Sequence, residues 1–217
     1  MNEMKGIYFI SGIDTNIGKS IATGWLAKTL QQNGIKVITQ KLVQTGNNGY
    51  SEDIELHRKI MNVDLFPEDI AGLTAPVIFT YPASPHLAAE IDKKELDTNT
   101  ITNAGKILEK RYDVVLLEGA GGLMVPLTRN LLTIDYIARL DYPVILVTSG
   151  KLGSINHTFL SLESIRNRKM KLHSVIYNLS PQTDELITCD SLKTIRQYMQ
   201  KYFSGSLLLQ MPELADI

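Results

Sequence analysis

Ser11-Gly-Ile-Asp-Thr-Asn-Ile-Gly-Lys-Ser20 is the stretch that decides the fold, because it joins an apolar run, Ile7 to Ile10, to a segment with helical periodicity. A strand that ends in glycine and then opens a helix leaves unpaired backbone N–H groups, which attract phosphate. Lys19 would place a positive charge beside the β- and γ-phosphates, and the Ser20 hydroxyl would bind Mg²⁺. Five residues lie between the glycines, one more than in the usual motif. The stretch therefore predicts a variant phosphate-binding loop (P-loop) and nucleotide binding, rather than a simple glycine turn.

Length and composition are those of an ordinary globular protein. The 217 residues are 44% hydrophobic and 21% charged, and we expect one domain over residues 1–217. The net charge of −1, with both signs interspersed, argues against a nucleic-acid surface or a polybasic membrane patch. No apolar run approaches the roughly 18 to 20 residues of a membrane span, and the first residues are too mixed for a signal peptide. We expect a soluble cytoplasmic protein.

The single cysteine, Cys189, excludes an internal disulfide framework and a multi-cysteine zinc site. We expect its side chain to be partly buried. The four histidines, at positions 57, 86, 157 and 173, are scattered along the sequence and are expected to be surface or loop residues rather than a metal site.

Strands and helices alternate along the rest of the chain. Expected strands cover 7–10, 35–40, 113–118, 143–148, 172–178 and 207–211; expected helices cover 21–30, 53–60, a short segment opened by Pro85, 99–111, 130–140, 158–168 and 192–203. Residues 66–85 contain several prolines and are read as irregular. Because a strand, helix, strand connection is right-handed and makes its two strands parallel, the pattern predicts an α/β fold. We expect a doubly wound, mostly parallel sheet with helices on both faces, of the P-loop NTPase type.

Acidic and basic side chains follow several of the expected strands. Lys41 opens a turn-rich loop after the second strand, on the edge of the sheet where α/β proteins bind ligands. Asp53 lies near the start of a helix that faces this loop, as a ligand or as a helix cap. Glu118 ends a strand expected to be buried on both faces and is followed by glycines. That position suits an acid that organises Mg²⁺, although a glutamate there could also leave the sheet into solvent. Residues 150–157 form a second glycine-containing loop before a helix, a candidate carboxylate or phosphate site.

Taken together, these segments closely resemble the dethiobiotin synthase family. The resemblance rests on residues 12–20, Lys41 with Thr45-Gly46, Ser84-Pro85-His86, Glu118-Gly-Ala-Gly-Gly122 and Lys151-Leu-Gly-Ser-Ile-Asn-His157, in this order over nearly the whole chain. The longer P-loop is the form that this family uses. The resemblance implies a ligase of biotin biosynthesis that takes diaminopelargonate, CO₂ and ATP with Mg²⁺, closes a cyclic urea, and releases ADP and phosphate. It implies that one amine is carbamylated, that the carbamate oxygen attacks the γ-phosphate, and that the second amine then displaces phosphate.

The resemblance also implies a role for each site residue. Catalysis is assigned to Lys41, Lys19 and Thr15, and Mg²⁺ to Ser20, Asp53 and Glu118. Nucleotide binding is assigned to Asn16, Ile17, Gly18, Lys19, Ser20, Ile21, Asp53, Glu118, Gly119, Ala120, Gly121, Asn178, Leu179 and Pro212, with the Asn178 amide reading the base. The diamine is assigned to Thr45, Pro85, Gly121 and Gly122, and its carboxylate to Gly153, Ser154 and Asn156 of the second subunit of a homodimer.

Two positions depart from the family pattern. Leu42 stands where a proline commonly follows the catalytic lysine, and we expect it to loosen that loop. The chain ends at Ile217, soon after Pro212, and this short tail leaves selectivity for adenine open.

Two other classes share this fold. Partitioning and positioning ATPases use nucleotide as a switch, but they carry a signature lysine five positions before the P-loop lysine, where this chain has Asp14. Amidotransferase synthetases of the cobalamin pathway append a glutaminase domain, for which this chain has no room. We retain the switch ATPase as the alternative function.

Overall fold

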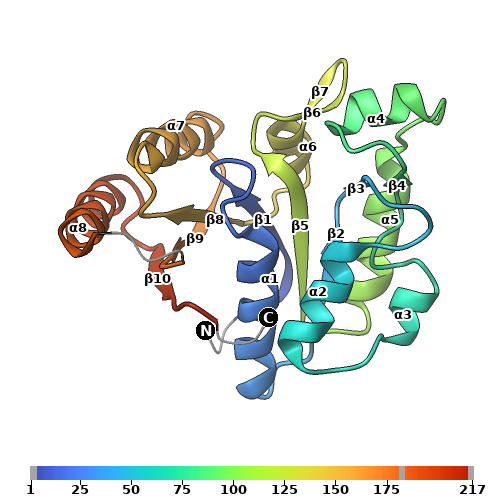
Figure 1. Ribbon diagram of the computed structural model, residues 1–217, viewed down its shortest axis with the longest axis horizontal. Coiled ribbons are helices and arrows are strands. Elements are labelled where there is room, and N and C mark those ends of the chain that lie inside the picture. The colour runs from blue at the N-terminus through green and yellow to red at the C-terminus, as the bar shows by residue number, and fades with distance from the viewer. Residues whose placement is uncertain (1–3, 181–183, 215–217) are drawn as a thin grey trace.

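The computed structural model describes residues 4–180 and 184–214 and is built around a parallel sheet of six strands (Figure 1). The strands are β1 (Gly6–Gly12), β2 (Val37–Lys41), β5 (Val114–Gly122), β8 (Val144–Ser149), β9 (Leu172–Asn178) and β10 (Leu207–Met211). Their order in the sheet is β10-β9-β8-β1-β5-β2, and every neighbouring pair is parallel. This arrangement confirms the predicted doubly wound α/β fold.

Helices cover both faces of the sheet. They are α1 (Lys19–Gln32), α2 (Glu52–Met61), α3 (Pro67–Ile70), α4 (Pro85–Ile91), α5 (Thr98–Glu109), α6 (Thr133–Arg139), α7 (Ser154–Asn167) and α8 (Glu185–Tyr202). One apolar core holds Leu26 and Leu30 of α1 with Met61 of α2. The other core includes residues of α5, α6, α7 and α8, such as Leu108 and Leu162. Figure 1 shows α1 and α2 side by side along the sheet, with α7 and α8 at the end formed by β8, β9 and β10.

The alternation of side chains along each strand determines which face of the sheet the charged side chains occupy. In β5, Val114 and Leu116 belong to the core under α1, whereas Val115 and Leu117 belong to the opposite core. Because successive side chains of a strand point to opposite faces, Glu118 faces α1. The same period in β2 places Lys41 on the face of Val37, which is also the α1 face. Both charged groups therefore meet the helix that the P-loop opens.

Several short elements were not predicted. The segment read as irregular contains α3, and two-residue strands β3 (Gln44–Thr45) and β4 (Ile78–Phe79) pair in parallel. A second small sheet, β6 (Pro126–Thr128) and β7 (Leu131–Leu132), is an antiparallel hairpin beside α4 and α6 (Figure 1). These strands are too short for an alternating pattern to reveal them.

Three element boundaries differ most from the prediction. Helix α7 begins at Ser154, since Gly153 precedes it with a φ of 93°, and helix α8 begins at Glu185, capped by the Asp184 carboxylate. Both caps lie ahead of the first residue in the apolar pattern. Strand β5 does not stop at Glu118 but continues to Gly122, which pairs with Gly12 of β1. Glu118 is therefore an internal residue of the strand.

Two further observations concern the surface. Cys189 is exposed, so the expectation of a partly buried side chain was wrong. None of the helices in the described part of the chain combines the length and the apolar composition needed to cross a membrane.

Candidate active site

The P-loop has a backbone that depends on its glycines. Gly18, which precedes α1, has a φ of 85° and lies in the left-handed region. A Cβ added to Gly12 would lie 2.6 Å from Cγ2 of Ile17, and one added to Gly18 would lie 2.4 Å from Nδ2 of Asn178. Asn178, at the end of β9, donates to the Ile17 carbonyl over 3.1 Å. The loop is therefore packed closely between β1 and the end of β9.

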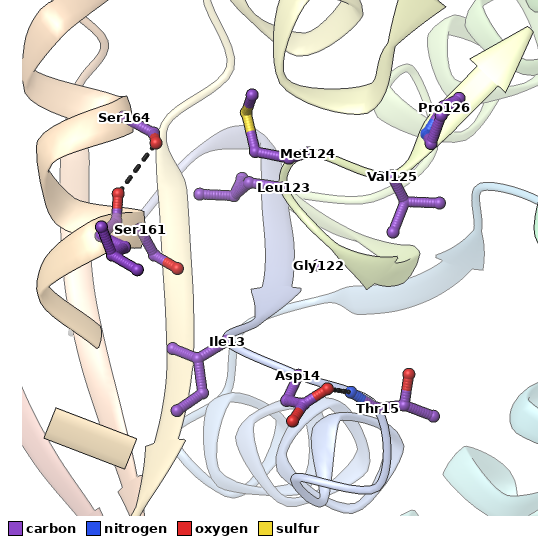
Figure 2. Close-up of a pocket in the computed structure, with 11 residues that line it drawn as sticks. Ile13, Asp14, Thr15, Gly122, Leu123, Met124, Val125, Pro126, Ser161 and Ser164 are labelled. Carbon is purple, nitrogen blue, oxygen red and sulfur yellow. Dashed lines mark hydrogen bonds between the residues drawn. The ribbon is translucent and has the colours of Figure 1, made fainter. Parts of the chain in front are cut away.

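Two cavities adjoin the P-loop. One, of about 420 Å³, is lined by Asp14, Thr15, Asn16, Gly18, Lys19, Ser20, Ile21, Asp53 and Gly121. The other, of about 430 Å³, lies between the end of β5 and helix α7 and is shown in Figure 2. It is lined by Ile13, Asp14, Thr15, Gly122, Leu123, Met124, Val125, Pro126, Leu160, Ser161 and Ser164. Asp14 and Thr15 line both cavities, so the P-loop separates a polar space from a largely apolar one.

A compact group of charged side chains lies beneath the first cavity. The Lys19 and Lys41 ammonium groups both donate to Oε1 of Glu118, at 3.0 and 2.7 Å. Lys41 also pairs with Asp53. Ser20 Oγ lies 2.6 Å from Oδ1 of Asp53 and 2.9 Å from Oε1 of Glu118. The P-loop, β2, α2 and β5 thus bring five predicted site residues into contact.

The two lysines differ in their electrostatic surroundings. Burial alone would lower the pKa of Lys41, but Glu118 and Asp53 together raise it. Burial and the neighbouring Lys41 lower the pKa of Lys19, although Glu118 opposes this shift. Burial acts to raise the pKa of Glu118, yet Lys19, Lys41 and His57 hold it well below its usual range. Glu118 is consequently an ionised carboxylate, and Lys41 is the more firmly charged of the two lysines.

The site offers oxygen ligands of the kind that Mg²⁺ prefers. One hydroxyl, from Ser20, lies within hydrogen-bond distance of carboxylates from α2 and β5, Asp53 and Glu118. Among the residues described here, no group of three or more His, Cys, Asp and Glu side chains could hold a metal by itself. A hydroxyl and two carboxylates beside a phosphate-binding loop nevertheless fit Mg²⁺, which commonly keeps waters and phosphate oxygens as its other ligands.

His57 was predicted to be a surface or loop residue, and this was wrong. Its side chain is fully buried, and Nε2 lies 2.8 Å from Oε2 of Glu118. The sequence does hold a signal for this contact, because His57 follows Asp53 by four residues and therefore shares its face of α2. Asp53 and His57 thus both contact the charged side chains beneath the first cavity.

Hydrogen bonds and burial answer three questions that the sequence raised, about Asp53, Glu118 and Leu42. Ser51, not Asp53, caps α2, since its side chain accepts from Ile54 N, and Asp53 is thereby left to contact Lys41 and Ser20. Glu118 is fully buried and does not leave the sheet into solvent. Leu42 is also fully buried, and its N–H donates to the Glu118 carbonyl at 2.8 Å, a bond that proline could not make. The expected loosening by Leu42 is therefore wrong.

Comparison with known proteins identifies the family. Residues 7–217 match a family described as an AAA domain. The chain is 49% identical to the ATP-dependent dethiobiotin synthetase BioD 2 of Pasteurella multocida, over 99% of this chain and 100% of that protein. It is 47% identical to the ATP-dependent dethiobiotin synthetase of Chlorobaculum tepidum, over 93% of this chain and 85% of that protein. The chain belongs to the dethiobiotin synthetase family.

Solved structures similar to this dethiobiotin synthetase family member show the fold alone. A ParA family ATPase from Chlorobium tepidum matches with a TM-score of 0.56 and 16% identity, over 98% of this chain and 86% of that chain. The signal recognition particle receptor FtsY from Elizabethkingia anophelis matches with a TM-score of 0.55 and 15% identity, over 99% of this chain and 60% of that chain. Both agree with the P-loop NTPase type of fold, but the far higher identity to dethiobiotin synthetases disfavours the switch ATPase alternative.

Some residues assigned from the dethiobiotin synthase resemblance lie outside both P-loop cavities. These are Lys41 and Glu118, which lie beneath the first cavity, and Ile17, Thr45, Pro85, Gly119, Ala120, Gly153, Ser154, Asn156, Asn178, Leu179 and Pro212. Asn178 donates a hydrogen bond to the carbonyl of Ile17 and thereby supports the P-loop. The Gly119 carbonyl lies 3.4 Å from the Lys41 ammonium. Thr45 is in β3 and Pro85 opens α4, where it is buried. In the first turn of α7, Ser154 is buried and Asn156 is exposed.

Proposed function

We propose that this chain makes dethiobiotin from diaminopelargonate and CO₂, with ATP converted to ADP and phosphate. The observation that carries the proposal is the contact of Lys19 and Lys41 with one oxygen of Glu118, beside the P-loop cavity. That contact occurs in a chain 49% identical to a named dethiobiotin synthetase. We further propose that residues 1–217 act as one cytoplasmic domain, with small-molecule substrates and without a nucleic-acid or membrane partner.

The polar cavity suits the nucleotide. Backbone N–H groups of residues 16–21 and the Lys19 ammonium would bind its phosphates, as expected at a helix N-terminus. Asn178 joins the end of β9 to the P-loop through Ile17, and we propose that Leu179 and Pro212, which follow β9 and β10, line the site of the base.

Ser20, Asp53 and Glu118 would hold Mg²⁺, which supplies charge neutralisation at the β- and γ-phosphates. Lys41 is buried between Asp53 and Glu118, and these carboxylates keep it positively charged. A fixed cation at this point stabilises the negative charge that spreads over the transferring phosphoryl group. Lys19 contacts the same carboxylate from the P-loop side, so the two ammonium groups can approach the γ-phosphate and the carbamate from different directions.

The chemical steps balance without another redox or group-transfer reagent. One amine of the diamine attacks CO₂ and loses a proton, which gives a carbamate. A carbamate oxygen displaces ADP from the γ-phosphate and forms a carbamic-phosphoric anhydride. The second amine attacks the carbonyl carbon, loses a proton and releases phosphate as the urea ring closes. Thr15 lines both cavities, and we propose that it contacts groups on both sides of this transfer.

The second cavity suits the diamine. Ile13, Leu123, Met124 and Val125 contribute apolar surface, which matches the alkyl chain of diaminopelargonate (Figure 2). The Gly122 backbone lines the same cavity, close to the P-loop. Thr45 and Gly121 are proposed to contact the amino groups, and Pro85 to support strand β3, which carries Thr45.

We propose that a homodimer completes the site. Gly153, Ser154 and Asn156 lie at the N-terminus of α7 but do not line either cavity of their own chain. Three apolar side chains near this end of the molecule are strongly exposed, at 89% for Leu152, 60% for Leu160 and 51% for Met124. A second subunit that covers them could bind the substrate carboxylate through its own α7 N-terminus. Mixing Lys41→Met and Asn156→Asp variants tests this, because a shared site restores activity in mixed dimers and separate sites do not.

The deciding experiment for the reaction measures phosphate release and dethiobiotin with each component omitted in turn. Release of phosphate that requires both diaminopelargonate and bicarbonate, with dethiobiotin formed in equal amount, supports the proposed ligase. Release that is unaffected by the diamine contradicts it and favours the switch ATPase. Comparing ATP with other nucleoside triphosphates in the same assay determines the base preference.

A further inference from the structure

The two carboxylate oxygens of Glu118 have separate partners. Oε1 faces the P-loop and lies 2.7 to 3.0 Å from Lys41, Ser20 and Lys19. Oε2 faces away from the P-loop and lies 2.8 Å from Nε2 of His57. A carboxylate can rotate about its last side-chain bond, and that bond is a soft torsion. A hydrogen-bond partner is therefore needed to keep Oε2 turned away from the lysines.

We propose that His57 is a positioning residue for Glu118, and that Thr39 and Arg58 set the direction of its hydrogen bond. The His57 ring lies between Glu118 and Thr39, with Nδ1 3.0 Å from Oγ1 of Thr39. The same Thr39 oxygen accepts a hydrogen bond from Nη1 of Arg58 at 2.8 Å. The proposal rests on the proposed function only in treating Glu118 as a ligand of Mg²⁺.

The direction follows from the available hydrogens. Arg58 can only donate, so it occupies a lone pair of the Thr39 oxygen. The Thr39 oxygen keeps a second lone pair, so the other ring nitrogen decides. The Glu118 carboxylate, paired with two ammonium groups, can only accept from Nε2, which leaves Nδ1 of the neutral ring to accept the Thr39 hydrogen. With Nδ1 accepting, the ring hydrogen is on Nε2 and is donated to Glu118. The chain of donors runs from Arg58 through Thr39 and His57 to the carboxylate.

The Arg58 end of this series of hydrogen bonds is fixed by an ion pair. Nε and Nη2 of Arg58 each donate to a different oxygen of Asp69 at 2.8 Å. Asp69 also accepts from the Thr74 hydroxyl and the Phe66 amide, both at 2.7 Å. The side chains of Arg58 and Asp69 are only 2% and 4% exposed. A bidentate arginine pair with this many bonds has little freedom to rotate, so it can hold Thr39 and His57 in one orientation.

The consequence concerns the orientation of Glu118. With Oε2 held by His57, only Oε1 is presented to Ser20, Lys19 and Lys41, and the ligand oxygen has one fixed position. Without the donor, the carboxylate can turn both oxygens toward the lysines. Partners that orient a metal-binding group typically change metal affinity about 10- to 100-fold when they are removed. His57 thus acts on Mg²⁺ through Glu118 and touches neither nucleotide nor substrate.

The hydrogen position can be measured directly in the wild-type protein. Long-range ¹H–¹⁵N correlation spectra of ¹⁵N-histidine-labelled protein distinguish a hydrogen on Nε2 from one on Nδ1. We expect the Nε2–H pattern for His57, whose signals are assigned by their loss in His57→Gln. An Nδ1–H pattern would overturn the proposal. Thr39→Val removes the hydroxyl that fixes Nδ1 and should weaken the Nε2–H preference.

A matched set of variants tests the effect on the metal. Manganese binding to the protein with ADP, measured by electron paramagnetic resonance, needs no turnover. His57→Leu should weaken Mn²⁺ binding about tenfold. His57→Gln retains an N–H near the position of Nε2 and should recover much of that loss. His173→Gln, at a partly buried histidine of β9, is the control and should bind Mn²⁺ like the wild type.

Circular dichroism and thermal unfolding establish which variants are folded. If His57→Leu does not fold, the comparison of His57→Gln and Thr39→Val with the wild type decides. Equal Mn²⁺ affinity in every folded variant would overturn the proposal and leave His57 as a packing residue. Because this readout is metal binding, it can succeed even if no dethiobiotin is formed, which separates its failure from that of the proposed reaction.

Discussion

Lys19 and Lys41 donate to the same oxygen of Glu118, although one lysine opens α1 and the other ends β2. A single buried carboxylate thereby holds two ammonium groups close together against their mutual repulsion. Asp53 provides a second carboxylate for Lys41 but makes no ion pair with Lys19. The two lysines are therefore not equivalent, and their removal should have different effects.

Lys41→Met should leave nucleotide binding nearly unchanged and lower turnover by roughly 100-fold or more, on the scale found for removing one transition-state donor. Methionine retains most of the side-chain volume but removes the buried cation between Asp53 and Glu118. Isothermal titration with ADP and the rate of dethiobiotin formation check the two parts. Lys36→Met is the control, since Lys36 is exposed and precedes the other end of β2. Full activity of Lys41→Met would exclude a catalytic role.

Lys19→Met should weaken nucleotide binding and turnover together. This residue lies in the P-loop and lines its cavity, so it is placed to contact phosphates both before and during transfer. A lysine that binds the ground state and the transition state equally affects KM as well as kcat/KM. Binding of ADP and initial rates over a range of ATP concentrations are the measurements. A loss confined to kcat would contradict this assignment.

Asp53→Asn and Glu118→Gln should each raise the Mg²⁺ concentration needed for half-maximal activity, by about tenfold or more. Both substitutions keep the shape of the side chain but replace a charged oxygen ligand by an amide. Glu52→Gln is the matched control, because Glu52 is the exposed neighbour of Asp53 on α2. An unchanged Mg²⁺ dependence in Asp53→Asn would show that its carboxylate only pairs with Lys41.

The P-loop, the sheet and the main charged residues could be predicted from sequence because each has a local signal. Glycines mark the loop, apolar runs mark buried strands, and strand ends in a parallel sheet share one edge, which brings Lys41 and Glu118 near the P-loop. The contact of His57 with Glu118 is different, since it depends on how α2 packs over β2 and β5. Only its spacing from Asp53 along α2 indicated which way the ring points.

The features that the sequence did not predict lack a local signal of this kind. The hairpin β6–β7 has strands of three and two residues, too short for alternation to register. The start of α7 is set by the left-handed backbone of Gly153, not by the apolar residues that follow. Asn178 was assigned to the base from the family resemblance, whereas its contact with Ile17 requires the tertiary fold.

Gly18→Ala should abolish nucleotide binding, because the new Cβ would lie 2.4 Å from Nδ2 of Asn178 and would also occupy a residue with a φ of +85°. Gly34→Ala separates these two causes. Gly34 has a φ of +78° but nothing within 4 Å of an added Cβ, so it incurs the backbone cost alone, about 1 to 2 kcal/mol. Nucleotide titration and thermal unfolding of both variants provide the comparison. Normal binding by Gly18→Ala would mean that Asn178 can move away from the loop.

Asp69→Asn should lower the free energy of unfolding by about 3 kcal/mol at neutral pH, because it breaks a buried ion pair with Arg58. Burial opposes ionisation of Asp69, but Arg58, Thr74 and the Phe66 amide still hold its pKa below the usual value. A carboxylate with a depressed pKa stabilises the fold above the pKa of the unfolded chain, near 3.9, and loses this contribution as the pH falls through the folded value. The difference between wild type and variant should therefore narrow below about pH 4.

Urea unfolding of wild type and Asp69→Asn at a series of pH values measures that difference, with Asp64→Asn as the control at an exposed aspartate. A difference that stays constant through the acidic range would show that the charge of Asp69 does not contribute to stability. The same variant loosens Arg58, which holds Thr39 and, through it, His57. It should therefore also weaken Mn²⁺ binding at neutral pH, while Asp64→Asn should not. A loss of stability without any change in Mn²⁺ affinity would show that the Arg58–Asp69 ion pair contributes to folding but not to metal binding.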